Sequence, residues 1–208
     1  MEVNGTTTLY GATTIYNTLD VGGFNVASDG LVTLSSNARV AKTLTFTANN
    51  LRTKGTSADP TLHVIEDYII TFAYANSSVH EVAGIAGIPC DYASGTNLKI
   101  RLHWAPEEDN QGDDEVVWGI EYGIFNSGDN LSTTSTTETV ADIAGVSEQL
   151  QKTDDITING SGVTSDDVLA FRIFRDPTDS RDTYDYDAYL MSVHICYISD
   201  KLGGDMRW

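Results

Sequence analysis

NLKIRLHWAPEEDNQGDDEVVWGIEYGIF, residues 97–125, is the stretch that decides the fold class of this 208-residue chain. Apolar side chains fall at every second position from Leu98 to Trp104 and again from Val116 to Ile124. This period of two is typical of strands that bury one face. An acidic loop that contains a glycine separates the two runs. We therefore expect a long-looped β-hairpin, in which Glu121 lies across from the basic residues of the first strand.

Most of the chain after His63 is also predicted to form strands. About eight candidate strands lie between residues 63 and 198, separated by turns rich in Gly, Asn and Asp. They do not alternate with helical segments, which disfavours an α/β enzyme fold. GDNLSTTSTTETVAD, residues 128–142, is either a polar surface loop or an edge strand, and a helix fits around Val140 to Gln151. The prediction is an all-β chain with a jelly-roll-like β-sandwich.

Five segments carry a resemblance to a known family: IPCDY, LKIRLHWAP, VVWGIEYG, DVLAFRIFRDPTD and DAYLMSVHICY. In this order they resemble the C-terminal β-domains of bacteriophage virion proteins, and the resemblance covers residues 88–198, about half the chain. It implies a trimeric jelly-roll-like knob on a short fibrous or capsid-binding N-terminal segment. Such proteins serve as head decorations, head fibres or tail-fibre tips. Because these motifs are packing patterns, they indicate architecture more than role.

The net charge of -18 is unevenly distributed along the chain. Residues 1–58 contain 3 acidic and 4 basic residues, whereas residues 59–208 contain 27 acidic and 8 basic residues, a net charge of -19. We predict an N-terminal docking or stalk segment over 1–58 and an acidic domain over 59–208. The plainest interpretation of the charge is a solvated surface. Because such a field repels nucleic acid and anionic membranes, neither is an expected partner.

The N-terminal segment TTTLYGATTIYNTLDVGGFNVASDGLVTL, residues 6–34, holds short apolar bursts between turn residues. Strands this short cannot close a core alone. The resemblance implies that three chains supply the missing partners, and the alternative is an ordinary β-meander packed on the same chain. The interface residues predicted from these bursts are Leu9, Tyr10, Ile15, Tyr16, Leu19, Val21, Phe24 and Val26.

The sequence offers few signals for secretion, membrane insertion or disulfide bonding. The chain starts without a basic region followed by an apolar core, and no apolar run approaches the ~18 residues that a membrane span needs. We expect a soluble protein without a classical signal or a membrane anchor. Cys90 and Cys196 are the only cysteines, so we expect two buried free thiols and no disulfide framework.

Catalytic chemistry has one candidate, the acidic runs Glu107–Asp109 and Asp113–Glu115. Paired carboxylates perform glycoside hydrolysis, but loop carboxylates at a hairpin tip are usually solvated. The sequence contains no nucleophile elbow, phosphate loop or zinc pattern. We therefore expect no enzymatic activity and no cofactor.

RDPTDSRDTYDYDAY, residues 175–189, is the best place for a ligand. Its calcium candidates are Asp176, Asp179 and Asp182, because carboxylates converging from one loop can hold Ca²⁺. Arginines close by in sequence can pair with the same carboxylates, and we prefer that interpretation. Three tyrosines in or beside the loop suit a carbohydrate face, although Tyr189 also fits the core or a trimer interface. They are Tyr184, Tyr186 and Tyr189.

These observations predict a non-enzymatic structural protein on the exterior of a phage particle. The expected role is a homotrimeric capsid decoration, of the cement or head-fibre kind, that docks through its N-terminal segment on the major capsid protein or another virion protein. The alternative is a tail-fibre tip or receptor-binding protein that recognises host surface glycans.

Overall fold

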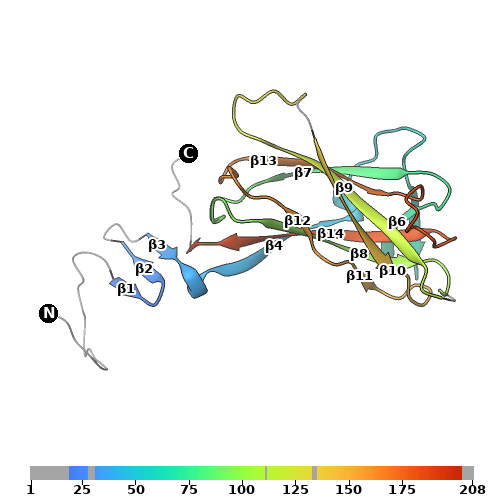
Figure 1. Cartoon of the computed structure of the whole chain (residues 1–208), viewed down its shortest axis with the longest axis horizontal. Helices are drawn as coiled ribbons and strands as arrows, with labels where there is room; N and C mark the ends of the chain where they lie inside the picture. The colour runs from blue at the N-terminus through green and yellow to red at the C-terminus, as the bar shows by residue number, and fades with distance from the viewer. Residues whose placement is uncertain (1–18, 28–30, 111, 133–134, 203–208) are drawn as a thin grey trace.

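The structure is a computed structural model that describes residues 19–27, 31–110, 112–132 and 135–202. Its regular secondary structure is almost entirely antiparallel strand, which confirms the all-β prediction (Figure 1). One four-stranded sheet has the order β10-β9-β13-β7. Its strands are β7 (His80–Gly87), β9 (Glu115–Phe125), β10 (Thr136–Ile143) and β13 (Val168–Arg175).

The second sheet of the sandwich has seven strands around the central pair β8 and β14. Strands β11 and β12 pair with the far edge of β8, while β4 and β6 share the far edge of β14 and β5 lies outside β6. The bounds are β4 (Val40–Thr47), β5 (Thr61–Ile65), β6 (Ile69–Tyr74), β8 (Leu98–Pro106), β11 (Gln151–Lys152), β12 (Ile156–Ile158) and β14 (Ala188–Ser199).

The chain crosses between these two sheets in the order expected for a jelly roll. From β6 it passes to β7 in the first sheet, back to β8, and then to β9 and β10. It returns to β11 and β12, and then crosses to β13 and back to β14. The sheets therefore read β6-β14-β8-β12 and β7-β13-β9-β10, the pattern of two Greek keys. The predicted jelly-roll fold is confirmed.

The predicted hairpin between β8 and β9 is wrong. The two strands belong to opposite sheets, and the loop between them crosses the sandwich. Their alternating patterns face the same core from two sides, and the rings of Trp104 and Trp118 meet there edge to face, with centroids 5.8 Å apart. Glu121 accordingly pairs with Arg172 on β13, not with the basic residues of β8.

A β-bulge in β14 changes which residues face the core. The register shifts between Leu190 and Ser192, so Leu190 and Val193 both lie in the main core. Tyr189 joins a small separate cluster with its strand neighbours Ala73 and Ala105. The bulge therefore separates Tyr189 from the face of Val193, because one extra residue reverses the alternation.

A separate small sheet lies at the end of the sandwich where β4 begins and β14 ends (Figure 1). It has the order β1-β2-β3-β15, with the strands β1 (Leu19–Val21), β2 (Phe24–Val26), β3 (Val32–Leu34) and β15 (Lys201–Leu202). The predicted division at residues 58/59 stays a prediction. In the structure β4, on the N-terminal side of that division, pairs with β14 over residues 192–199, and Leu51 is buried in the core.

The described helices are two single turns of 3-10 helix, Ser36–Ala38 and Ala48–Asn50. The helix predicted around Val140 is wrong, because residues 136–143 form an edge strand against β9. In the part of the chain that the structure describes, no helix has the length and apolar character needed to span a membrane. Both thiols are free as predicted, but Cys90 is exposed and Cys196 is only half-buried.

Candidate functional site

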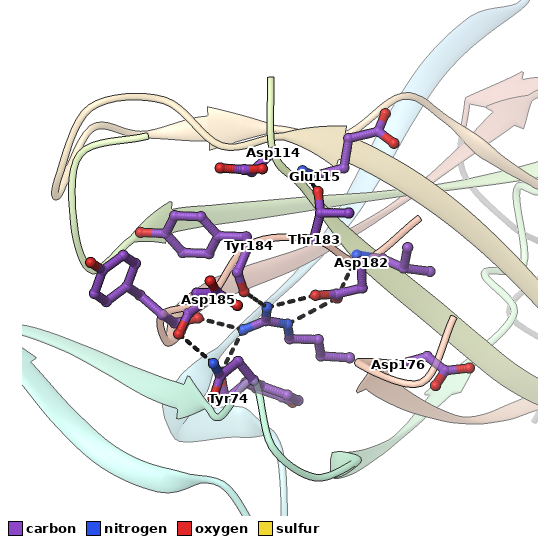
Figure 2. A network of polar contacts seen from close by, with 12 residues as sticks. Tyr74, Asp114, Glu115, Asp176, Asp182, Thr183, Tyr184 and Asp185 are labelled. Atoms are coloured by element: carbon purple, nitrogen blue, oxygen red, sulfur yellow. Dashed lines mark hydrogen bonds and ion pairs between the residues drawn. The ribbon is translucent and has the colours of Figure 1, made fainter. Parts of the chain in front are cut away.

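The Asp-rich loop after β13 is closed around a buried arginine (Figure 2). The Arg175 side chain is 0% exposed. Its Nε and Nη2 donate to the two carboxylate oxygens of Asp182 at 3.0 and 2.7 Å. The same guanidinium donates to the carbonyl oxygens of Tyr74, Tyr184 and Tyr186 at 3.2, 2.5 and 2.7 Å. The charge is fully paired, so this network holds the loop in place.

Each of the three calcium candidates interacts with a different partner within the loop. Asp182 faces Arg175, while Asp179 forms an ion pair with Arg181 at 2.8 Å. Hydrogen bonds from Arg181 hold the pKa of Asp179 at about 2. Asp176 accepts hydrogen bonds from the backbone N–H and the hydroxyl of Thr178. Among the described residues, no three His, Cys, Asp or Glu side chains converge as metal ligands.

The carbohydrate face predicted beside this loop is not formed. Tyr184 and Tyr189 are buried, and Tyr186 is the one of the three predicted rings that is substantially exposed. The Tyr184 hydroxyl donates to the backbone carbonyl of Glu108 and accepts from its N–H, which ties two loops together. The Glu107 carboxylate of the acidic run likewise accepts the backbone N–H of Asp187 at 3.0 Å.

A groove of about 600 Å³ lies on the outer face of the β7-β13-β9 sheet, and we call it the outer groove. Phe171 and Ile173 point into the core, so Arg172 between them points outward from β13. In the register of the sheet, Arg172 lies between Glu121 on β9 and Ala83 on β7. The residues used below line the groove: Lys54, Glu81, Glu121, Phe125, Leu131 and Arg172.

Ion pairs and hydrogen bonds connect the polar side chains of the outer groove. Arg172 donates from Nε to Glu121 at 2.5 Å and from Nη1 to Glu81. Lys54 approaches the second oxygen of Glu81 at 2.5 Å, and the Ser135 hydroxyl donates to Glu121. The hydrogen bond from Ser135, followed by the one from Arg172, lowers the pKa of Glu121. Both carboxylates therefore have fixed positions, and Glu121 stays ionised.

Glycines on β9 make room for aromatic rings on this face. The Phe174 ring occupies the space beside Gly119 in which a Cβ would lie. The guanidinium of Arg172 lies 4.7 Å from the centroid of that ring, a cation–π contact. The Phe125 ring similarly covers Gly123, where an added Cβ would lie 2.7 Å from its Cζ. The rings therefore lie low on the sheet and leave the groove open.

The small N-terminal sheet has one apolar face. Strand pairing matches Phe24 with Leu34 and Val32 with both Val26 and Leu202, so these five side chains share a face. Leu34 is buried there, but Phe24 is 37% exposed and Leu202 is 53% exposed.

Four of the eight predicted interface residues belong to this sheet. Leu19 is the backbone partner of Val26, and Val21 is the partner of Phe24. The other four lie outside the described residues. They are Leu9, Tyr10, Ile15 and Tyr16.

No family model and no curated protein sequence matches this chain. Among solved structures it is similar to the CBM22-2 xylan-binding domain of Paenibacillus barcinonensis Xyn10C, with 12% identity and a TM-score of 0.43 over 76% of this chain and 98% of that chain. It is also similar to the CBM22-1 and GH10 modules of a Clostridium thermocellum xylanase, with 11% identity and a TM-score of 0.42 over 68% of this chain and 25% of that chain. A third similar structure is the Gx strain of infectious bursal disease virus, with 13% identity and a TM-score of 0.37 over 79% of this chain and 33% of that chain. This is distant likeness to carbohydrate-binding and viral structures, and it assigns neither a ligand nor a role.

Proposed function

We propose that this protein is a non-enzymatic structural component of a bacteriophage particle, a homotrimeric capsid decoration protein on the exterior of the head. The observation that carries the proposal is the apolar face of the small N-terminal sheet. Strands of two and three residues cannot bury such a face on their own. Phe24 and Leu202 would be covered by neighbouring subunits and by the capsid shell.

The charge distribution supports the same orientation on a particle. The almost neutral segment 1–58 supplies three of the four strands of the small sheet, whereas the strongly acidic segment 59–208 forms most of the sandwich. Docking through the neutral end avoids bringing many negative charges together at the interface, and the acidic end stays in water. A stable interface of this kind buries about 1,600 Å² in total.

The carboxylates of the outer groove support a non-enzymatic role. A glycoside hydrolase needs a general acid with a raised pKa beside a second carboxylate. The pKa of Glu121 is lowered, and both Glu121 and Glu81 bind Arg172.

The proposal is tested by binding purified variants to phage particles that lack the protein, followed by pelleting and immunogold electron microscopy. Phe24→Asp places a charge on the apolar face, and Asn25→Asp places the same charge on the opposite face of the same strand. We expect the protein to be a trimer in analytical ultracentrifugation and to label heads. Phe24→Asp should abolish labelling, whereas Asn25→Asp should preserve it. Equal labelling by both variants, a monomeric protein or label at the tail tip would contradict the proposal.

A deletion variant should stop before β4. Removing residues 1–34 takes away β1 to β3, but removing residues up to Ala58 would also take away β4 and the buried Leu51. Loss of binding by the longer deletion would then reflect an unfolded sandwich. The shorter deletion, checked by circular dichroism, should fold and fail to bind heads.

The second candidate function is a tail-fibre tip or receptor-binding protein that recognises host surface glycans. The outer groove favours it, because it is an open hollow with fixed polar groups and an aromatic ring.

A further inference from the structure

We propose that the outer groove binds an uncharged glycan chain, with Arg172, Glu81 and Glu121 as hydrogen-bonding partners of its hydroxyl groups and Phe125 as the platform for a sugar ring. The inference deepens the second candidate function and rests on it. It needs only the glycan recognition of that candidate, and a location on the head or on the tail is compatible with it.

The position of the groove leaves it accessible in a docked protein. It lies on the outer face of the β7-β13-β9 sheet, whereas the small N-terminal sheet continues from β14 and β4 of the other sheet. An attachment made through the small sheet therefore leaves the β7-β13-β9 face open (Figure 1). Its volume of about 600 Å³ lies within the range of ~300 to 1,000 Å³ that is usual for small-molecule sites.

The charges of the groove exclude a charged ligand. Lys54 and Arg172 supply two positive charges, Glu81 and Glu121 supply two negative charges, and these side chains form ion pairs with one another. A charged ligand would give this balanced cluster of four side chains a net charge. Anions are further disfavoured by the net charge of -19 on residues 59–208.

The remaining hydrogen-bonding capacity suits hydroxyl groups, which both donate and accept. Each carboxylate oxygen of Glu81 and Glu121 has one partner, so each keeps a lone pair for a hydroxyl donor. Within the described part of the chain, Nη2 of Arg172 makes no hydrogen bond, so its N–H groups are available to a hydroxyl acceptor. These groups are held rigidly, which reduces the entropic cost of binding.

Apolar surface beside the polar groups completes the pattern expected for a sugar ring. The Phe125 ring lies over Gly123 at the base of the groove, and Leu131 from the following loop is 75% exposed. A pyranose presents C–H groups on its faces and hydroxyl groups around its edge. Its face would pack on Phe125 while its edge reaches the carboxylates and Arg172.

The experiment uses an array of neutral and anionic oligosaccharides probed with the labelled full chain, followed by titration calorimetry with neutral hexasaccharides that bind. We expect binding to at least one neutral oligosaccharide and none to polygalacturonate fragments. Phe125→Ala should weaken the affinity about tenfold or more, and Phe125→Tyr should retain it. Ile85→Ala is the matched control, because Ile85 is exposed on the same face of β7 but outside the groove.

Three results would overturn the proposal: no neutral oligosaccharide bound, selective binding of anionic ones, or equal affinity for the wild type and Phe125→Ala. Arg172→Gln provides a second test of the polar half of the site, with its melting temperature measured alongside. These assays need no phage particles, so their failure leaves the labelling of heads by the protein unaffected.

Discussion

Replacing Asp182 with Asn should destabilise the sandwich more than any other single charge change in the Asp-rich loop. Asp182 is 2% exposed in its side chain, and it is the only carboxylate paired with Arg175, which is 0% exposed, among the described residues. The variant removes the negative charge and one of the two side-chain acceptors, so the buried guanidinium keeps only an uncharged amide oxygen and backbone carbonyls as acceptors. Breaking a buried ion pair from one side costs about 3–5 kcal/mol.

Urea unfolding, followed by circular dichroism, measures this loss of free energy of unfolding. In a thermal scan the melting temperature should fall by roughly 6–20 °C, at about 2–4 °C per kcal/mol for a domain of this size. Asp179→Asn is the matched control, since its partner Arg181 is on the surface and the pair is solvated. The double variant Arg175→Met/Asp182→Asn should recover part of the loss, because no charge is then buried without a partner. The reasoning fails if Asp182→Asn unfolds at the same urea concentration as Asp179→Asn.

Two further predictions concern protons and metal. Burial, followed by neighbouring positive groups that include Arg101, lowers the pKa of His103 and His194 from 6.5. The centroids of the two rings lie 4.1 Å apart. The unfolded chain therefore binds protons more readily, so the free energy of unfolding should fall as the pH drops below about 6.5, and His194→Gln should flatten that dependence in urea titrations at several pH values. The Asp-rich loop, residues 175–189, is held by its own arginines, so EDTA and Ca²⁺ should leave the melting temperature unchanged. A rise with Ca²⁺ would show a metal site.

Sequence patterns predicted the positions of the strands better than which strands lie side by side. The alternation from Leu98 to Trp104 correctly marks which side chains of β8 are buried. The same alternation arises whether β9 lies beside β8 in one sheet or across the core from it, because both arrangements bury one face. The hairpin was therefore a permitted interpretation of residues 97–125 that only the sheet order excludes.

Local departures from regular strand pairing also leave no clear signal in the sequence. The bulge at Met191 inserts one residue, and no glycine or proline in the surrounding sequence announces it. The edge strand Thr136–Ile143 was one of the two interpretations left open for residues 128–142, and the helix predicted from Val140 overlaps its last four residues. In such a segment the intrinsic preference for helix contributes less free energy than the pairing with a neighbouring strand.

The outer groove was beyond the reach of sequence analysis for a related reason. Glu81 and Arg172 are 91 positions apart, and β7 and β13 become neighbours only through the Greek-key crossing. The signal in the sequence was a single arginine between Phe171 and Ile173, which marks an outward-facing charge on a buried strand. It does not say what that charge faces.

The two proposed surfaces can act at the same time because they belong to different sheets. Strand β14 runs directly into β15 of the small sheet, and β14 pairs with β4 and β8. The small sheet is therefore connected to the β8-β14-β4 layer of the sandwich. The outer groove belongs to the opposite layer, and in the described part of the chain no strand of that layer pairs with the small sheet. Phe24→Asp should therefore remove particle binding without changing glycan affinity, and Phe125→Ala should do the reverse. If a variant at either position weakens both particle binding and glycan binding, one surface serves both roles. The assignment of these two roles to different sheets would then be wrong.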